Sequence, residues 1–113
     1  MRRLLLSTAV VSALGLFSAT AAQAFECPGH FKAAEEEIAR VSQALEAAGG
    51  MVAAGDRALV HALLDDAKAL LAAARHNHEK PQGKYDHARA LAKADSALAY
   101  ARAAGMLLER VGS

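Results

Sequence analysis

The sequence predicts an all-α protein, an up-down-up antiparallel three-helix bundle that follows a cleaved signal peptide. Apolar residues recur at alternating spacings of three and four, which is the pattern of helices packed at a shallow angle. Almost no stretch alternates with period two, as a half-buried strand would. A glycine-rich and a proline-glycine segment divide the pattern into three parts of helical length. These observations together indicate a small bundle with short connections.

The first 24 residues are typical of a secretory signal peptide. Two arginines precede an apolar run over residues 4–17, and small residues then lead to an Ala-x-Ala sequence at 22–24. We expect cleavage after Ala24 and a single periplasmic domain over residues 25–113. No second apolar stretch of spanning length follows, so no membrane span is expected in the mature chain.

The composition of the remaining chain limits both its partners and its core. Removing the leader takes away two of the 13 basic residues and leaves eleven against twelve acidic ones, with the basic residues dispersed. Nucleic-acid binding is therefore not expected. The chain is alanine-rich, and a small core of this kind usually needs tight packing, a metal, a disulfide or a partner. Its single cysteine cannot form an intramolecular disulfide.

The first helix is predicted over about residues 28–48. Pro28 suits a first helical turn because its missing N–H would be unpaired there in any case. Gly49 and Gly50 provide a C-terminal stop. The apolar stripe of this segment consists of Phe31, Ala34, Ile38, Val41, Leu45 and Ala48.

The second and third helices are predicted over about 57–78 and 85–111. Asp56 is expected to be the N-cap of the second, and the segment EKPQGK (79–84) ends it. The stripe of the second helix is Val60, Leu64, Ala67, Leu71 and Ala74. The stripe of the third is Leu91, Ala94, Leu98, Ala101, Gly105 and Leu108. Short connections favour antiparallel neighbours. A two-helix hairpin over 56–111 with a loosely attached first helix is the alternative.

One further step of four along each stripe reaches a residue that binds metals. The first stripe extends back to Cys27, the second extends forward to His78, and the third extends back to His87. In an up-down-up bundle these three positions share one end. A thiolate and imidazoles suit copper, zinc or nickel, and copper tolerates the three-ligand set. We therefore expect one transition-metal ion, copper or zinc, at this end of the bundle.

Three more residues fall near the same end and are expected as secondary ligands: His30, His76 and Asp86. The alternative interpretation is that no metal binds. Protonated histidines near the C-terminus of a helix are favoured by the helix dipole, which would explain His76 and His78 without a metal. In that case the bundle would serve as a periplasmic structural or interaction protein, docking to a protein partner or forming a homodimer through Cys27. An enzyme is not expected, since no oxyanion-stabilising loop is evident.

Residues 60–104 resemble the small periplasmic metal-binding proteins of proteobacteria, in which His-bearing amphipathic helices collect divalent metals. The resemblance rests on the pattern VHALLDDAKALLAAARHNHEKPQGKYDHARALAKADSALAYARAA. It implies a metal buffer or chaperone. Those proteins repeat histidine along their helices, whereas this chain has none after His87, which favours one site. The segment FECPGHFKAAEEEIA (25–39) is similar to small exported proteobacterial proteins whose mature chains begin near a Cys-Pro pair.

Overall fold

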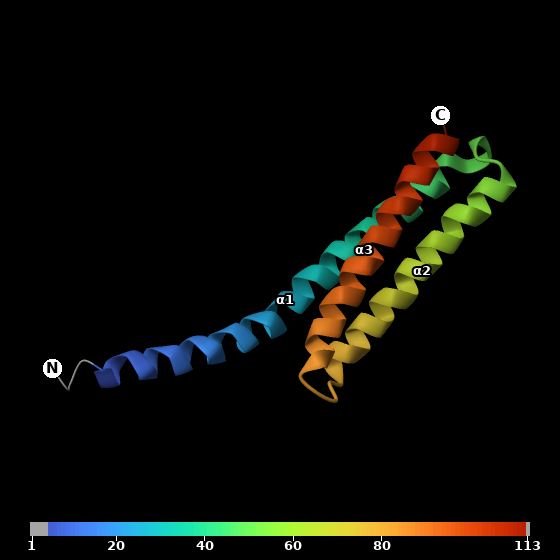
Figure 1. The fold of residues 1–113 in the computed structure, drawn as a ribbon. Helices are drawn as coiled ribbons and strands as arrows, with labels where there is room; N and C mark the ends of the chain where they lie inside the picture. Colours follow the sequence, from blue (N-terminus) through green and yellow to red (C-terminus); the bar gives the residue numbers. More distant parts are fainter. Residues whose placement is uncertain (1–4, 113) are drawn as a thin grey trace.

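Three helices pack against one another in the order that the sequence predicts. The computed structural model describes the backbone of residues 5–112 and the side chains of residues 26–112. Its elements are α1 (Leu5–Ala48), the short 3-10 helix η1 (Gly49–Met51), α2 (Ala54–Glu79) and α3 (Tyr85–Val111). Every pair of the three α-helices is in contact, and no strand occurs among the described residues. The all-α three-helix bundle is thus confirmed, with the first helix an integral part of it (Figure 1).

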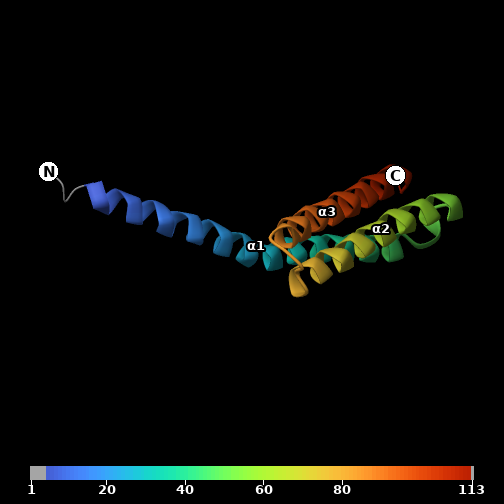
Figure 2. The same ribbon diagram turned by 60° about the horizontal axis from the view of Figure 1, so that its bottom comes forward.

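Helix α1 begins much earlier than predicted. Pro28 lies inside the helix rather than in its first turn. The preceding stretch is rich in alanine and leucine, which are the best helix formers, and a proline inside a helix bends it instead of always ending it. In both views the early part of α1 (blue) extends beyond the bundle, while its later part (teal) lies along the other two helices (Figures 1 and 2).

The predicted leader, residues 1–24, falls outside the part of the chain whose side chains are described. Residues 1–4 lie outside the described residues altogether, and residues 5–24 are described by their backbone alone. Cleavage after Ala24 therefore stays a prediction. Within the described residues, no helix combines the length and the apolar character needed to cross a membrane.

Helix α2 begins at Ala54, and Asp56 is not its N-cap. The N-cap is Ala53, which offers no side-chain hydrogen bond, and Asp56 lies in the first turn. The tight connection explains the difference. Gly49 takes a φ of 53°, and the guanidinium of Arg57 donates to the carbonyl oxygen of Gly49. Asp56 can still complement the positive end of the helix dipole from its place in the first turn.

The core follows the predicted stripes of α1 and α2, but the stripe of α3 is shifted by one position in part. The predicted residues of α2 are all buried, as are those of α1 except the partly buried Ala48. On α3 the buried line consists of Ala90, Ala94, Ala97, Ala101, Ala104, Gly105 and Leu108. Leu91 and Leu98 are only partly buried and pack against this core from the side. The small side chains of this line let α3 pack closely against both α1 and α2. The two leucines then lie at the edge of these contacts.

Candidate metal centre

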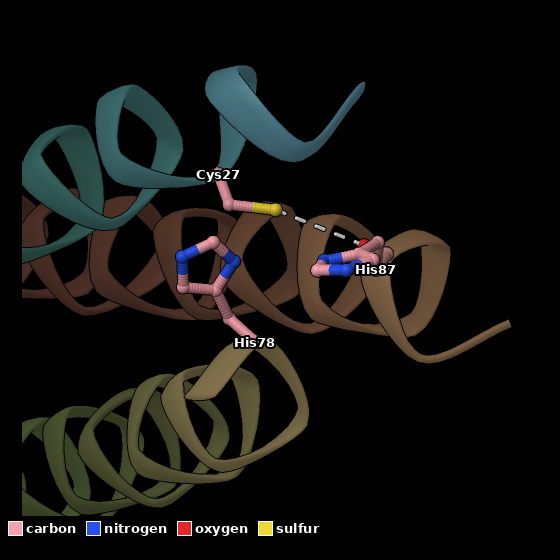
Figure 3. A group of neighbouring side chains, drawn as sticks. All are labelled: Cys27, His78 and His87. Carbon is pink, nitrogen blue, oxygen red and sulfur yellow. Dashed lines mark hydrogen bonds between the residues drawn. The ribbon is translucent and has the colours of Figure 1, made fainter. Parts of the chain in front are cut away.

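One end of the bundle brings together a sulfur atom and two imidazoles from three different helices. Cys27 belongs to α1, His78 to the last turn of α2 and His87 to the first turn of α3. One potential ligand atom from each lies within 4.8 Å of the other two. Figure 3 shows the three side chains converging from their separate helices. The three residues reached by extending the apolar stripes are thus neighbours in space.

The cysteine is buried, and burial sets its protonation state. The Cys27 side chain has no solvent exposure, and its S–H donates to the carbonyl oxygen of His87 at 3.9 Å (Figure 3). Burial raises the pKa of the Cys27 thiol above its ordinary value, and the nearby charge of Glu26 adds to the effect. Without a metal, this residue is therefore a neutral thiol at pH 7, and it becomes a thiolate ligand only when a cation displaces its proton.

The two histidines each bury a nitrogen atom that has no hydrogen bond. The Nδ1 atoms of His78 and His87 are both buried and lack a partner among the described residues. A buried polar atom left in this way costs about 1–3 kcal/mol, so native structures rarely keep one without a reason. Both rings also place a nitrogen within 4.8 Å of the buried Cys27 sulfur. A bound metal ion would satisfy both nitrogens at once.

Aromatic contacts hold the rings in place. Phe31 meets His78 edge to face, with ring centroids 5.5 Å apart and planes at 82°. His78 meets His87 in the same manner at 5.6 Å and 71°. Edge-to-face pairs of this kind are favourable and directional. Phe31 also places an apolar wall beside the site, which strengthens electrostatic interactions within it.

Two buried polar residues beside the ligands brace the helix ends. Asn77 accepts a hydrogen bond from the Lys93 ammonium at 2.6 Å, which ties the end of α2 to α3. Asp86 accepts from the backbone N–H of Gln82 at 2.5 Å, which closes the connection between these helices. Asn77 was not predicted as a site residue. The signal was present, because Asn77 stands three residues after Ala74 on the α2 stripe.

The predicted secondary ligands lie outside the group of three. Asp86 is engaged by Gln82 and by the Arg89 guanidinium at 3.5 Å. The Nδ1 atom of His30 lies 2.5 Å from a carboxylate oxygen of Asp95 on α3, in an exposed pair. His76 is exposed on α2. The structure therefore assembles three of the six candidate residues and gives the other three separate surroundings.

Comparison with known proteins adds nothing to this geometry. No family model, no curated protein and no solved structure matches the chain.

Proposed function

We propose that this chain is a small exported helical protein that binds one transition-metal ion, copper, zinc or nickel, at the bundle end, as a metal buffer or chaperone. The observation that carries the proposal is the pair of buried Nδ1 atoms of His78 and His87 without hydrogen bonds, in two rings that each place a nitrogen within 4.8 Å of the Cys27 sulfur. Such an arrangement costs stability in the empty chain and is relieved by a cation.

The donor chemistry supports a borderline or soft metal. A thiolate with imidazoles suits copper, zinc and nickel, whereas magnesium and calcium prefer oxygen ligands. The carboxylate next to His87, that of Asp86, is occupied by the loop backbone and by Arg89. The histidine rings are only half-buried, so an ion can reach the site from solvent between the helix ends.

The proposed location rests on the leader pattern in residues 1–24. Export would place the site where metals arrive from outside the cell. N-terminal sequencing of the chain recovered from the periplasmic fraction tests this part, with Phe25 as the expected first residue.

Native mass spectrometry tests the metal proposal. The reduced chain is titrated separately with Cu(I), Zn(II) and Ni(II), and one ion per chain is expected for at least one of them. Cys27→Ala and His87→Ala should each lower the affinity at least tenfold, because each removes one of three ligands. His76→Ala is the matched control, since His76 lies on the same helix as His78 but is exposed.

The metal proposal fails if none of the three ions binds at micromolar concentration. It also fails if binding survives in Cys27→Ala and His87→Ala but is lost in His76→Ala. Circular dichroism of each variant shows whether a loss of binding reflects a loss of helix instead.

A second candidate function is a docking bundle without metal. A shallow apolar depression lies between α2 and α3, lined by Leu63, Ala99, Tyr100 and Ala103, and Met106 is exposed nearby on α3. A homodimer through Cys27 fits the structure less well, because that sulfur has no solvent exposure. Sedimentation of the metal-free chain distinguishes these ideas: self-association without metal favours docking.

A further inference from the structure

We infer that the site formed by Cys27, His78 and His87 is a copper centre that holds Cu(I) and Cu(II) in turn and so carries one electron. This inference rests on the proposed metal binding and names the metal and its chemistry. Four features carry it: the number of donors, their charge, the identity of the donor atoms and the burial of the sulfur.

The number of donors favours copper over zinc. Within the part of the chain that the structure describes, a single group of three or more candidate ligands is found, and it has three members. Structural zinc sites are almost always closed by four protein ligands. None of the three residues expected as secondary ligands belongs to this group: His30 pairs with Asp95, Asp86 accepts from the loop backbone, and His76 is exposed. Zinc would therefore need a water molecule to complete its shell here, whereas copper accepts three protein donors alone.

The charge of the donors matches Cu(I). One thiolate and two neutral imidazoles carry a single negative charge, so a Cu(I) complex is neutral overall. The sulfur is buried and Phe31 covers one side of His78. Leaving a net charge in such surroundings is costly, and a divalent ion would leave one positive charge there. The reduced form is therefore the more stable one.

The donor atoms are also those that support Cu(II). A trigonal set of two histidines and one cysteine with a weak axial oxygen or thioether is the ligand arrangement of copper electron-transfer sites. Here the two unsatisfied nitrogens are both Nδ1, and the carbonyl oxygen of His87 lies 3.9 Å from the sulfur. The three ligands come from three helices that pack against one another, which limits how far they can move apart (Figure 3). A fixed geometry that serves both oxidation states lowers the cost of moving an electron.

Burial protects the thiolate from the reaction that usually destroys it. Two thiolates and two Cu(II) ions yield one disulfide and two Cu(I) ions, with one electron passing from each sulfur to a copper. That reaction needs two sulfur atoms in contact. This chain has a single cysteine, and its side chain is fully buried, so two copies cannot bring their sulfurs together without opening the bundle. The Cu(II) form therefore lasts long enough to accept one electron from a soluble donor.

The electron balance is simple. Oxidation removes one electron from bound Cu(I) and gives Cu(II), with the electron going to a soluble one-electron acceptor. Reduction returns one electron from a soluble donor. No bond to the protein forms or breaks in either direction.

An optical titration tests the inference. The reduced chain is loaded with one Cu(I) and then oxidised with hexacyanoferrate(III). We expect a strong visible absorption band from thiolate-to-Cu(II) charge transfer, with one equivalent of oxidant consumed per copper. Ascorbate should remove the band. Several rounds of oxidation and reduction should then be possible without loss of copper. Cys27→Ser should abolish the band, and His76→Ala should leave it unchanged.

The outcomes separate this inference from the proposed function. If Zn(II) or Ni(II) binds at the three residues and copper does not, the proposed function stands and the inference is wrong. If Cu(I) binds but oxidation gives no band, releases copper or yields a disulfide-linked dimer, the inference is likewise wrong. If Cys27→Ser loses its helical signal, His87→Gln takes its place, with a shifted or weakened band expected.

Discussion

Burial governs the behaviour of Cys27 before any metal arrives. Removal from water raises the pKa of this thiol, because the charged thiolate is the form that burial penalises. The folded chain therefore holds this proton more tightly than the unfolded chain does. The thiol becomes a metal ligand only when a thiophilic ion displaces its proton. Because the side chain is buried, small organic reagents reach it only when the bundle opens.

The raised pKa of Cys27 predicts a pH dependence of stability in the metal-free chain. A cysteine in an unfolded chain has a pKa of about 8.5. Below that range this residue's contribution to folding is fully present, and it is lost as the pH rises toward the higher pKa of the folded state. Urea unfolding at pH 7 and pH 9.5 should show lower stability at the higher pH. Cys27→Ala should reduce that difference, and an unchanged difference would contradict the account.

Alanine substitutions at one buried and one exposed leucine of α2 test which face of this helix packs in the core. Leu64 is only 1% exposed, whereas Leu59 is 57% exposed. Leu64→Ala should lower the free energy of unfolding by about 2–5 kcal/mol, the usual cost of emptying a packed core position. Leu59→Ala should change it by no more than about 0.5 kcal/mol. Denaturant unfolding measures both, and equal effects would show that the assignment of the core face is wrong.

Single residues show what sequence spacing can and cannot predict. Extending the apolar stripes predicted that Cys27, His78 and His87 would meet, because helical periodicity carries a face over several turns. The same spacing could not show that Asp86 would be taken up by the backbone of Gln82. It also did not show Asn77 bonding to Lys93. Those partners depend on how the loop closes and on how far long side chains reach, and neither is periodic.

At the scale of elements, the contact between α1 and α3 depends on a residue without a side chain. A Cβ atom built on Gly105 would lie 3.2 Å from a methyl carbon of Val41 and 3.1 Å from the guanidinium of Arg40. The arginine can move aside, but Val41 is fully buried. Close approach at this point is therefore part of the bundle geometry.

Glycine substitutions test that contact directly. Gly105→Leu should lower the free energy of unfolding by about 1–3 kcal/mol through overpacking. Gly55 is the control, because it lies in the first turn of α2 with open space around it. Gly55→Ala should raise stability by up to about 1 kcal/mol, as alanine is the better helix former. Thermal unfolding compares the two, and a tolerated Gly105→Leu would contradict the close α1–α3 packing.

Helix boundaries were less predictable than helix faces. The start of α3 and the ends of all three helices agree with the sequence signals to within a residue or so. The starts of α1 and α2 do not, because α1 passes through Pro28 and α2 begins without a capping side chain. Capping rules describe local preferences, and here alanine-rich flanking sequence and a tight connection override them. The extra length of α1 lies away from the bundle (Figure 2).

The early part of α1 extends away from α2 and α3 in both views (Figures 1 and 2). A chain of residues 25–113 should therefore retain the helical bundle, the unfolding midpoint and the metal stoichiometry of the full chain. Calorimetry and native mass spectrometry check this expectation. A large loss of stability on removing residues 1–24 would mean that the early part of α1 packs on the bundle.

At the scale of the whole molecule, metal binding and folding are coupled. The three ligands come from three helices and exist as a group only when the bundle is formed, so a bound ion stabilises the folded state alone. At a free metal concentration one hundred times Kd, the gain is about 2.7 kcal/mol. The core is rich in alanine and the single cysteine cannot form a disulfide within the chain, so that gain is a large share of the total stability.

This coupling predicts a metal-dependent unfolding midpoint. Excess Cu(I) or Zn(II) should raise the midpoint by several degrees, on the order expected for a small domain. The rise should grow with the logarithm of metal concentration and disappear in the double variant His78→Ala/His87→Ala. Differential scanning fluorimetry under reducing conditions measures it. A similar rise in the double variant would place the binding elsewhere.

The most direct test of the central claim is X-ray absorption spectroscopy of the zinc-loaded chain, which counts the atoms bound to the metal. One sulfur at about 2.3 Å and two imidazole nitrogens at about 2.0–2.1 Å are expected, with water completing the shell. Cys27→Ala should lose the sulfur and His76→Ala should keep it. A wild-type shell of oxygen and nitrogen without sulfur would contradict a site built from Cys27, His78 and His87.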